Sequence, residues 1–173
     1  MARITRHSWK FDLVVLSTCF SGTPRTIAAL TPYAQTIIAS PDNLHLSYLD
    51  LQPFATVEKR LQSEDVRTFA REYAHWAFQR LSARVETAVT VAVYDIVRVQ
   101  TYINSVDTSY RRTLTAFGGQ FAGSIEYYDC AENPAYVLPG MNDGVYLYYR
   151  PARFGRTKNK REHSGWECSR YLQ

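Results

Sequence analysis

The hydrophobic pattern of the chain begins with a short, almost continuous apolar run at residues 11–17 (FDLVVLS). A run of this kind, rich in β-branched residues, is typical of a strand that is covered on both faces, as in a parallel sheet. After a turn, Thr23 and Pro24 provide an N-cap and a first-turn proline for a short helix that ends before Pro32. Residues 35–40 (QTIIAS) form a second apolar run, so this segment predicts a strand–helix–strand crossover with adjacent parallel strands.

Farther along, apolar residues recur at helical spacing. Ser63 is expected to cap an amphipathic helix that has Glu64 and Asp65 in its first turn. The apolar face of this helix is formed by residues three or four positions apart: Val66, Phe69, Ala70, Tyr73, Ala77 and Leu81.

Two more strands and another helix follow. Residues 87–94 (TAVTVAVY) predict a third strand, and residues 144–150 (GVYLYYR) predict a late one. Between them, Asp95 is expected to cap a helix that ends near Gly118 and has its own apolar face: Val99, Ile103, Val106, Tyr110 and Leu114. The pattern therefore predicts an α/β fold with a mostly parallel sheet flanked by helices, in a domain of residues 1–150, followed by a basic loop and tail at residues 151–173.

Composition supports a globular domain, since the 173 residues are 46% hydrophobic. No apolar run approaches the roughly 18 residues of a membrane span, and no signal peptide is recognisable, so a cytoplasmic location is expected. The net charge of +4 is concentrated in residues 153–163. This segment contains five basic residues and one glutamate. Such a run is usually a solvated loop, and single-stranded nucleic acid binding through it is the less favoured alternative.

The cysteines narrow the candidate chemistry. Cys19, Cys130 and Cys168 are odd in number, form no CxxC pair and have no zinc-site spacing, which predicts free thiols without a disulfide framework. Cys19 directly follows the first strand and precedes a short helix, so it is expected at the carboxyl edge of the sheet, where the helix dipole and nearby amides favour a nucleophilic thiolate and an oxyanion. The alternative is a buried structural cysteine.

This segment resembles a known family. The stretch FDLVVLSTCFSGTPRTIAALTPYAQTIIASPDNLHLSYLDL is similar to the strand–Cys–helix–strand segment of clostripain-like cysteine peptidases of the caspase superfamily. Two later stretches, VTVAVYDIVRVQTYINSVDTSYRRTL and GVYLYYRP, are similar to that family's later elements. The resemblance covers the Cys-bearing later portion of a family member, and it implies that Cys19 is the nucleophile and that the N-terminal strands of the domain are missing.

The resemblance also implies a substrate pocket. Ser17, Ser40, Asp42 and His45 would flank it. The family often has Asp at the position of Ser17, as part of an acidic pocket for Arg or Lys, so a preference for basic residues does not carry over. The turn CFSG also resembles that of other caspase-like groups. No cofactor is expected, and calcium is suggested by the resemblance alone.

A catalytic histidine is harder to place. The family's base lies on a strand before the Cys strand, in a His-Gly turn, and no histidine here is followed by Gly. His7 starts about 20 Å from Cys19, at the opposite end of the strand. His75 lies on the predicted amphipathic helix and His163 in the basic loop, whereas His45 follows the second parallel strand and shares the edge of Cys19. His45 is therefore a candidate base, although a loop or pocket-wall position is the simpler interpretation.

Three functions remain open. The first is a cysteine endopeptidase, or its nucleophile-bearing chain, that forms a thioester on Cys19 and needs a His-bearing segment. The second is a catalytically inactive caspase-like scaffold that binds or regulates, and the third is the nucleic-acid alternative. Because an exposed apolar strand edge invites pairing, self-association or a second chain is expected to cover it, and no membrane contact is expected.

Overall fold

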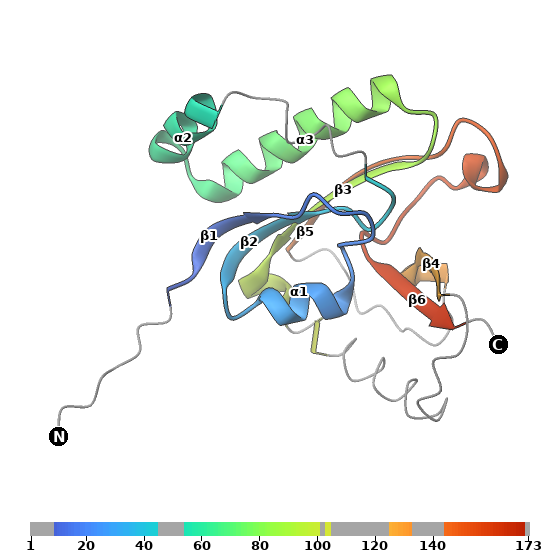
Figure 1. The fold of residues 1–173 in the computed structure, drawn as a ribbon, viewed down its shortest axis with the longest axis horizontal. Coiled ribbons are helices and arrows are strands. Elements are labelled where there is room, and N and C mark those ends of the chain that lie inside the picture. Colours follow the sequence, from blue (N-terminus) through green and yellow to red (C-terminus); the bar gives the residue numbers. More distant parts are fainter. Residues whose placement is uncertain (1–8, 45–53, 101–102, 105–124, 133–143, 172–173) are drawn as a thin grey trace.

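The computed structural model describes residues 9–44, 54–100, 103–104, 125–132 and 144–171. Within these residues, a four-stranded sheet carries helices on both faces, and a two-stranded sheet lies next to it (Figure 1). No helix in these segments is long and apolar enough to cross a bilayer.

The first three elements form the predicted crossover. They are β1 (Phe11–Val15), α1 (Pro24–Leu30) and β2 (Ala34–Ala39), and β1 pairs with β2 in parallel. Thr23 caps α1, because its hydroxyl accepts the N–H of Thr26 at 2.9 Å. The prediction of two adjacent parallel strands joined by a short helix is therefore confirmed.

Two later strands complete the main sheet in the order β1-β2-β3-β5. These are β3 (Val89–Asp95) and β5 (Val145–Arg150), and β3 runs antiparallel to both of its neighbours. The α/β class with flanking helices is confirmed, and the sheet is mixed, since β1–β2 is the parallel pair among its described strands. Asp95 is the last residue of β3 and directly precedes the helical backbone that begins at Ile96, which is the expected N-cap position, although neither of its carboxylate oxygens has a hydrogen-bond partner within the described residues. Positions 106, 110 and 114 of the expected apolar face lie outside the described residues.

Two consecutive helices lie on one side of the sheet, and the second of them packs against its strands. They are α2 (Phe54–Ser63) and α3 (Val66–Arg84). The expected cap was wrong by two residues: Ser63 ends α2, and Asp65 caps α3 by accepting the N–H of Thr68 at 3.1 Å, since an aspartate caps as well as a serine does. The buried face of α3 contains the predicted residues from Phe69 to Leu81 together with Ala74.

The core has one layer on each side of the sheet, because side chains alternate between the faces of a strand. On one side, Ile38 and Val93 pack with α3. On the other side, Ile37 and Tyr94 pack with α1 and with the fully buried Trp166. Figure 1 shows this division, with α3 and α1 on opposite faces of the sheet.

The second sheet was not predicted from the sequence. It contains β4 (Ile125–Asp129) and β6 (Glu167–Tyr171), which pair antiparallel. The short 3₁₀ helix η2 (Cys130–Glu132) follows β4, and η3 (Arg156–Asn159) lies in the basic segment. Most of that segment is exposed, as expected for a solvated loop.

A disulfide joins Cys130 to Cys168, with a Cα–Cα distance of 4.9 Å. The expectation of free thiols was therefore wrong for these two cysteines. Their partnership is created by the pairing of β4 with β6, which the sequence spacing does not reveal. Disulfides persist chiefly in oxidising compartments, so this pairing does not favour the expected cytoplasmic location, which stays a prediction.

Candidate active site

Cys19 lies in the turn between β1 and α1, and it is exposed. Its Sγ is 3.3 Å from both the backbone nitrogen and the backbone oxygen of Leu44, a residue that follows β2. Because β1 and β2 are parallel, both strands direct their following residues to the same edge of the sheet. The thiol therefore stands where ligands usually bind in α/β sheets, and the alternative of a buried structural cysteine does not apply.

The backbone after Cys19 is tied to the residues that follow β2. Phe20 donates its N–H to the carbonyl of Asp42 at 3.0 Å, and Ser21 and Gly22 both donate to the carbonyl of Ser40, at 2.9 and 3.0 Å. Within the described part of the chain, the N–H of Cys19 itself has no acceptor. One amide beside the sulfur is thus available to a ligand, while the next three hold the turn in place.

Gly22 is required by close packing beneath this turn. A Cβ atom at this position would lie 2.5 Å from the hydroxyl oxygen of Tyr94 and 2.9 Å from the nitrogen of Pro41. Tyr94 in turn donates its hydroxyl to the carbonyl of Gly165 at 2.6 Å. The turn therefore rests directly on a core tyrosine that also holds the segment leading into β6.

A network of buried and half-buried polar groups lies next to the turn. Asp42 accepts a hydrogen bond from the hydroxyl of Thr90, and its Oδ2 lies 3.6 Å from Nε2 of His163. The Nδ1 of His163 accepts the N–H of Gly165 at 2.9 Å, which places the imidazole proton on Nε2, toward Asp42. Burial alone would raise the pKa of Asp42, but the contacts with His163 and Thr90 and the charge of Lys160 hold it below its usual value.

Asp129 extends this network from β4. Its carboxylate accepts the N–H and hydroxyl of Ser164 and the N–H of Ala131, and Nζ of Lys160 lies 3.1 Å away. His163 was expected in a solvated loop, but its side chain is buried between Asp42 and Asp129, since its Nδ1 lies 3.8 Å from Asp129 Oδ1. The basic segment thus turns inward at its end.

Glu167 is the most unusual group near the turn. Its N–H donates to the carbonyl of Gly22 at 3.1 Å, and its side chain is almost fully buried, with 1% of the residue exposed. Neither carboxyl oxygen has a hydrogen-bond partner within the described part of the chain. Burial, and then the negative charge of Asp42, raise the pKa of Glu167 to about 9, so this acid is uncharged at neutral pH.

The residues predicted to flank a pocket occupy different positions. Ser17 is half-buried after β1, and His45 lies outside the described residues. Ser40 is completely buried, and its hydroxyl exchanges hydrogen bonds with the backbone of Asp42 at 3.1 and 3.2 Å. Ser40 and Asp42 thus support the turn of Cys19, and their contact with a substrate stays a prediction.

The influence of the α1 dipole on the thiol stays a prediction. Residues 20–23 separate Cys19 from the first residue of α1, Pro24, and the dipole effect falls off within one turn. Among the described residues, no group of three or more His, Cys, Asp or Glu is arranged to hold a metal ion.

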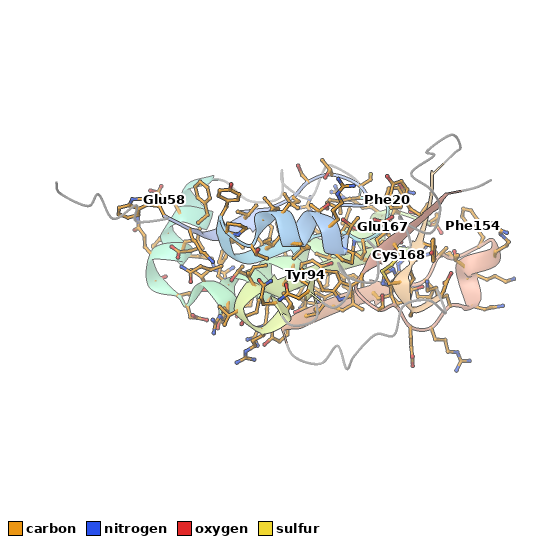
Figure 2. The ribbon with its side chains drawn as sticks, turned by 90° about the horizontal axis from the view of Figure 1, so that it is seen from below. Phe20, Glu58, Tyr94, Phe154, Glu167 and Cys168 are labelled. Carbon is orange, nitrogen blue, oxygen red and sulfur yellow. A yellow bond between two sulfur atoms is a disulfide. The ribbon has the colours of Figure 1, made fainter. Side chains whose placement is uncertain are left out.

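Several site residues were missed from the sequence. Asp129 and Glu167 lie in strands whose sequences show no clear hydrophobic period, and Lys160 and His163 were assigned to a loop. Figure 2 shows Phe20 of the turn and Glu167 of β6 next to each other, although they lie far apart in the chain. Glu167 lies between Trp166 and Cys168, which are both buried. Its burial could be inferred from these neighbours only once their own burial was known.

Comparison with known proteins shows a distant structural similarity. No protein-family model matches the sequence, and no curated protein sequence matches it. The chain is similar to the solved structure of a B. fragilis cysteine protease, with 18% sequence identity and a TM-score of 0.43. The match covers 58% of this chain and 43% of that protein, so the chain spans less than half the length of this structural neighbour.

Proposed function

We propose that this chain is the nucleophile-bearing part of a cysteine peptidase of clostripain type, with Cys19 as the nucleophile. The observation that carries the proposal is the position of the sulfur: it is exposed at the carboxyl edge of two parallel strands, against the backbone of Leu44. The backbone nitrogen and the backbone oxygen of Leu44 both lie 3.3 Å from the sulfur, and these two contacts hold it in place.

The chemistry follows from this arrangement. The Cys19 thiolate attacks the carbonyl carbon of the scissile peptide, and the electron pair of the C=O bond moves to oxygen. The N–H of Cys19, which has no acceptor within the described residues, supports this oxyanion. When the C–N bond breaks, the leaving amine takes a proton and the acyl group remains on sulfur as a thioester. Water then hydrolyses the thioester, releasing the acid and restoring the thiol.

The proton acceptor must come from a histidine that the described residues do not bring to Cys19. His75 is exposed on α3, where its ring stacks on Tyr148 at 5.0 Å, and His163 is buried against Asp42. We therefore propose that a second chain or another copy of this chain supplies the base. His45, which lies outside the described residues, is the candidate within the chain.

The outer edge of β1 is the proposed docking position for that partner. β1 pairs with β2 on one side and with no described strand on the other. Phe11 at its start is 68% exposed, and Trp9 before it is 87% exposed. A strand added at this edge would cover both the open backbone groups and this apolar surface.

Labelling with an electrophilic peptide tests the proposed function. All three cysteines are described and Cys19 is the free one, so an acyloxymethyl ketone probe with Arg, Lys or a small residue before the electrophile has one thiol target. We expect one adduct by intact mass, none in Cys19→Ser, and a labelling rate that rises with protein concentration if a second copy supplies the base. Light scattering over the same concentrations should show association, and a clean monomer would count against pairing at β1.

A catalytically inactive binding module is the second candidate, favoured by the absence of a histidine next to Cys19 among the described residues. Iodoacetamide separates the two functions, because it needs an accessible thiol but no assembled site. Alkylation by iodoacetamide without labelling by any peptide probe, at every protein concentration, would favour the inactive module.

A further inference from the structure

Phe20, the residue after Cys19, has an unusual backbone conformation. Its φ of 52° lies in the left-handed region, and it is the one non-glycine residue with positive φ in the described part of the chain. This region is disfavoured for a bulky L-residue, because the Cβ approaches the backbone too closely. Such a conformation persists only where the surrounding structure holds it.

Two contacts hold Phe20 in this conformation. Its N–H donates to the carbonyl of Asp42 at 3.0 Å, which orients the peptide that links it to Cys19. Its ring stacks on the ring of Tyr127 in β4, with centroids 4.7 Å apart and planes 11° from parallel. The first contact comes from the segment that follows β2, and the second comes from the separate two-stranded sheet.

The sheet that presents Tyr127 is itself fixed to the same turn. The N–H of Glu167 in β6 donates to the carbonyl of Gly22, and the disulfide between Cys130 and Cys168 joins the end of β4 to β6. β4 and β6 thus contact the turn at two points, one at Phe20 and one at Gly22. Figure 2 shows Phe20 and Glu167 close together on this side of the molecule.

We propose that Tyr127 is a positioning residue for Cys19: its ring keeps Phe20 left-handed, and the left-handed backbone directs the Cys19 sulfur against Leu44. The proposal rests on the proposed function, because it assigns Tyr127 a part in preparing the same nucleophile. Without the ring contact, Phe20 relaxes to negative φ, and the preceding peptide and the Cys19 side chain turn with it. The sulfur then leaves its position 3.3 Å from the backbone nitrogen and the backbone oxygen of Leu44.

The test compares Tyr127→Leu with two reference variants. Tyr127→Phe keeps the stacked ring, and Tyr33→Leu removes a tyrosine that is similarly exposed, 58% against 43%, but does not contact the turn. The readout is the rate of Cys19 alkylation by iodoacetamide from pH 5 to pH 10, followed by intact mass on folded protein. We expect the rate of alkylation to change by about twofold or more in Tyr127→Leu, and to stay at the wild-type value in the other two.

A glycine at position 20 provides an independent check. Glycine adopts positive φ without strain, so in a Phe20→Gly background the further change Tyr127→Leu should have no effect on the alkylation profile. If Tyr127→Leu fails to fold, Phe20→Leu removes the same stack from the other side and should give the same shift. A profile of Tyr127→Leu equal to that of Tyr33→Leu, or a full effect of Tyr127→Leu in the Phe20→Gly background, overturns the proposal.

Alkylation by iodoacetamide is independent of peptidase activity, so the two proposals fail in different ways. If the wild type is not labelled by any peptide probe while the Tyr127→Leu profile shifts, the peptidase proposal fails and the positioning of Cys19 stands. If the wild type is labelled and the Tyr127→Leu profile does not shift, the peptidase proposal stands and the positioning role fails.

Discussion

The turn of Cys19 is built by two regions that differ in how the sequence encodes them. The first is the β1–α1–β2 crossover of residues 11–39, in which every element is adjacent in the chain to the next. The second is the β4–β6 sheet, whose two strands and disulfide join residues 125–130 to residues 167–171. The first region places Cys19 at the sheet edge, and the second contacts the two residues Phe20 and Gly22 that follow it.

The difference shows that location and orientation of the thiol have separate origins. A local crossover is specified by the alternation of apolar runs and turns, so its geometry is readable from a short window. The β4–β6 sheet depends on contacts between distant segments, whose loop-closure cost is offset by the disulfide and by burial of Trp166.

The largest expected effect concerns Glu167 in the second region. Its pKa is raised to about 9 in the folded state from 4.5, so its contribution to stability is fully present below pH 4.5 and is lost as the pH rises to about 9. The loss is about 1.4 kcal/mol per pH unit across that window, or about 6 kcal/mol at most. Urea unfolding at several pH values should therefore show Glu167→Gln gaining on the wild type as the pH rises.

Glu162→Gln is the matched control, because Glu162 is exposed in the same segment of the chain. Its stability is measured over the same pH range as the reference. A pH dependence of Glu167→Gln equal to that of Glu162→Gln would mean that the carboxyl of Glu167 ionises normally and is not desolvated.

Removal of the disulfide is expected to have the next largest effect. The bridge spans a sequence separation of 38 residues, and its loss in Cys130→Ser/Cys168→Ser costs about 4 kcal/mol in the chain-entropy treatment. Urea unfolding measures the overall loss of stability, and hydrogen exchange shows which strands lose protection. We expect amide protection to fall in β4 and β6 more than in β2, because β2 is paired on both sides within the main sheet.

Cys19→Ser serves as the control for this pair of substitutions, since Cys19 is exposed and unbridged and its loss should change stability little. An equal loss of protection in β2 and β6 would show that the two regions unfold as one unit. The two regions would then differ in their contacts but not in their stability.

The sequence predicted the first region well and the second poorly, for physical reasons. The cap at Thr23 and the parallel β1–β2 pair depend on neighbours in the chain, and both are confirmed. The cap of α3 shifted by two residues because Ser63 and Asp65 are equally good caps, and packing of the helix decides between them. The exposure of Cys19 also follows from the local turn.

What the sequence could not supply is the partnership of distant residues. The spacing of Cys130 and Cys168 in the sequence does not indicate that they pair. His163 belongs to a charged segment that is expected to be solvated, but its side chain packs between Asp42 and Asp129. Such contacts depend on the pairing of β6 with β4, and no short stretch of sequence determines this pairing. The candidate nucleophile could thus be found from the sequence, whereas the groups that orient it could not.

Gly22 lies where the two regions meet, and its substitution should have an intermediate effect. In Gly22→Ala the new Cβ would approach the Tyr94 hydroxyl and the backbone of Pro41, and overpacking of this kind costs about 1–3 kcal/mol. Part of the clash is with Tyr94, so Tyr94→Phe should relieve it. We expect the double variant to be more stable than the sum of the single variants by at least about 0.5 kcal/mol. Additive losses in urea unfolding would place the clash on Pro41 alone.

The smallest expected effect tests whether the first region orients the thiol at all. Thr23→Ala removes the cap of α1 and should lower the free energy of unfolding by about 1 kcal/mol. Asp65→Ala removes the cap of α3, far along the chain from Cys19, at a similar cost. Because residues 20–23 separate Cys19 from α1, we expect both variants to keep the wild-type profile of Cys19 alkylation against pH.

A shift in Thr23→Ala that is absent from Asp65→Ala would mean that the start of α1 acts on the thiol directly. Unchanged profiles in both, beside a shift in Tyr127→Leu, would assign the orientation of Cys19 to the distant β4–β6 sheet.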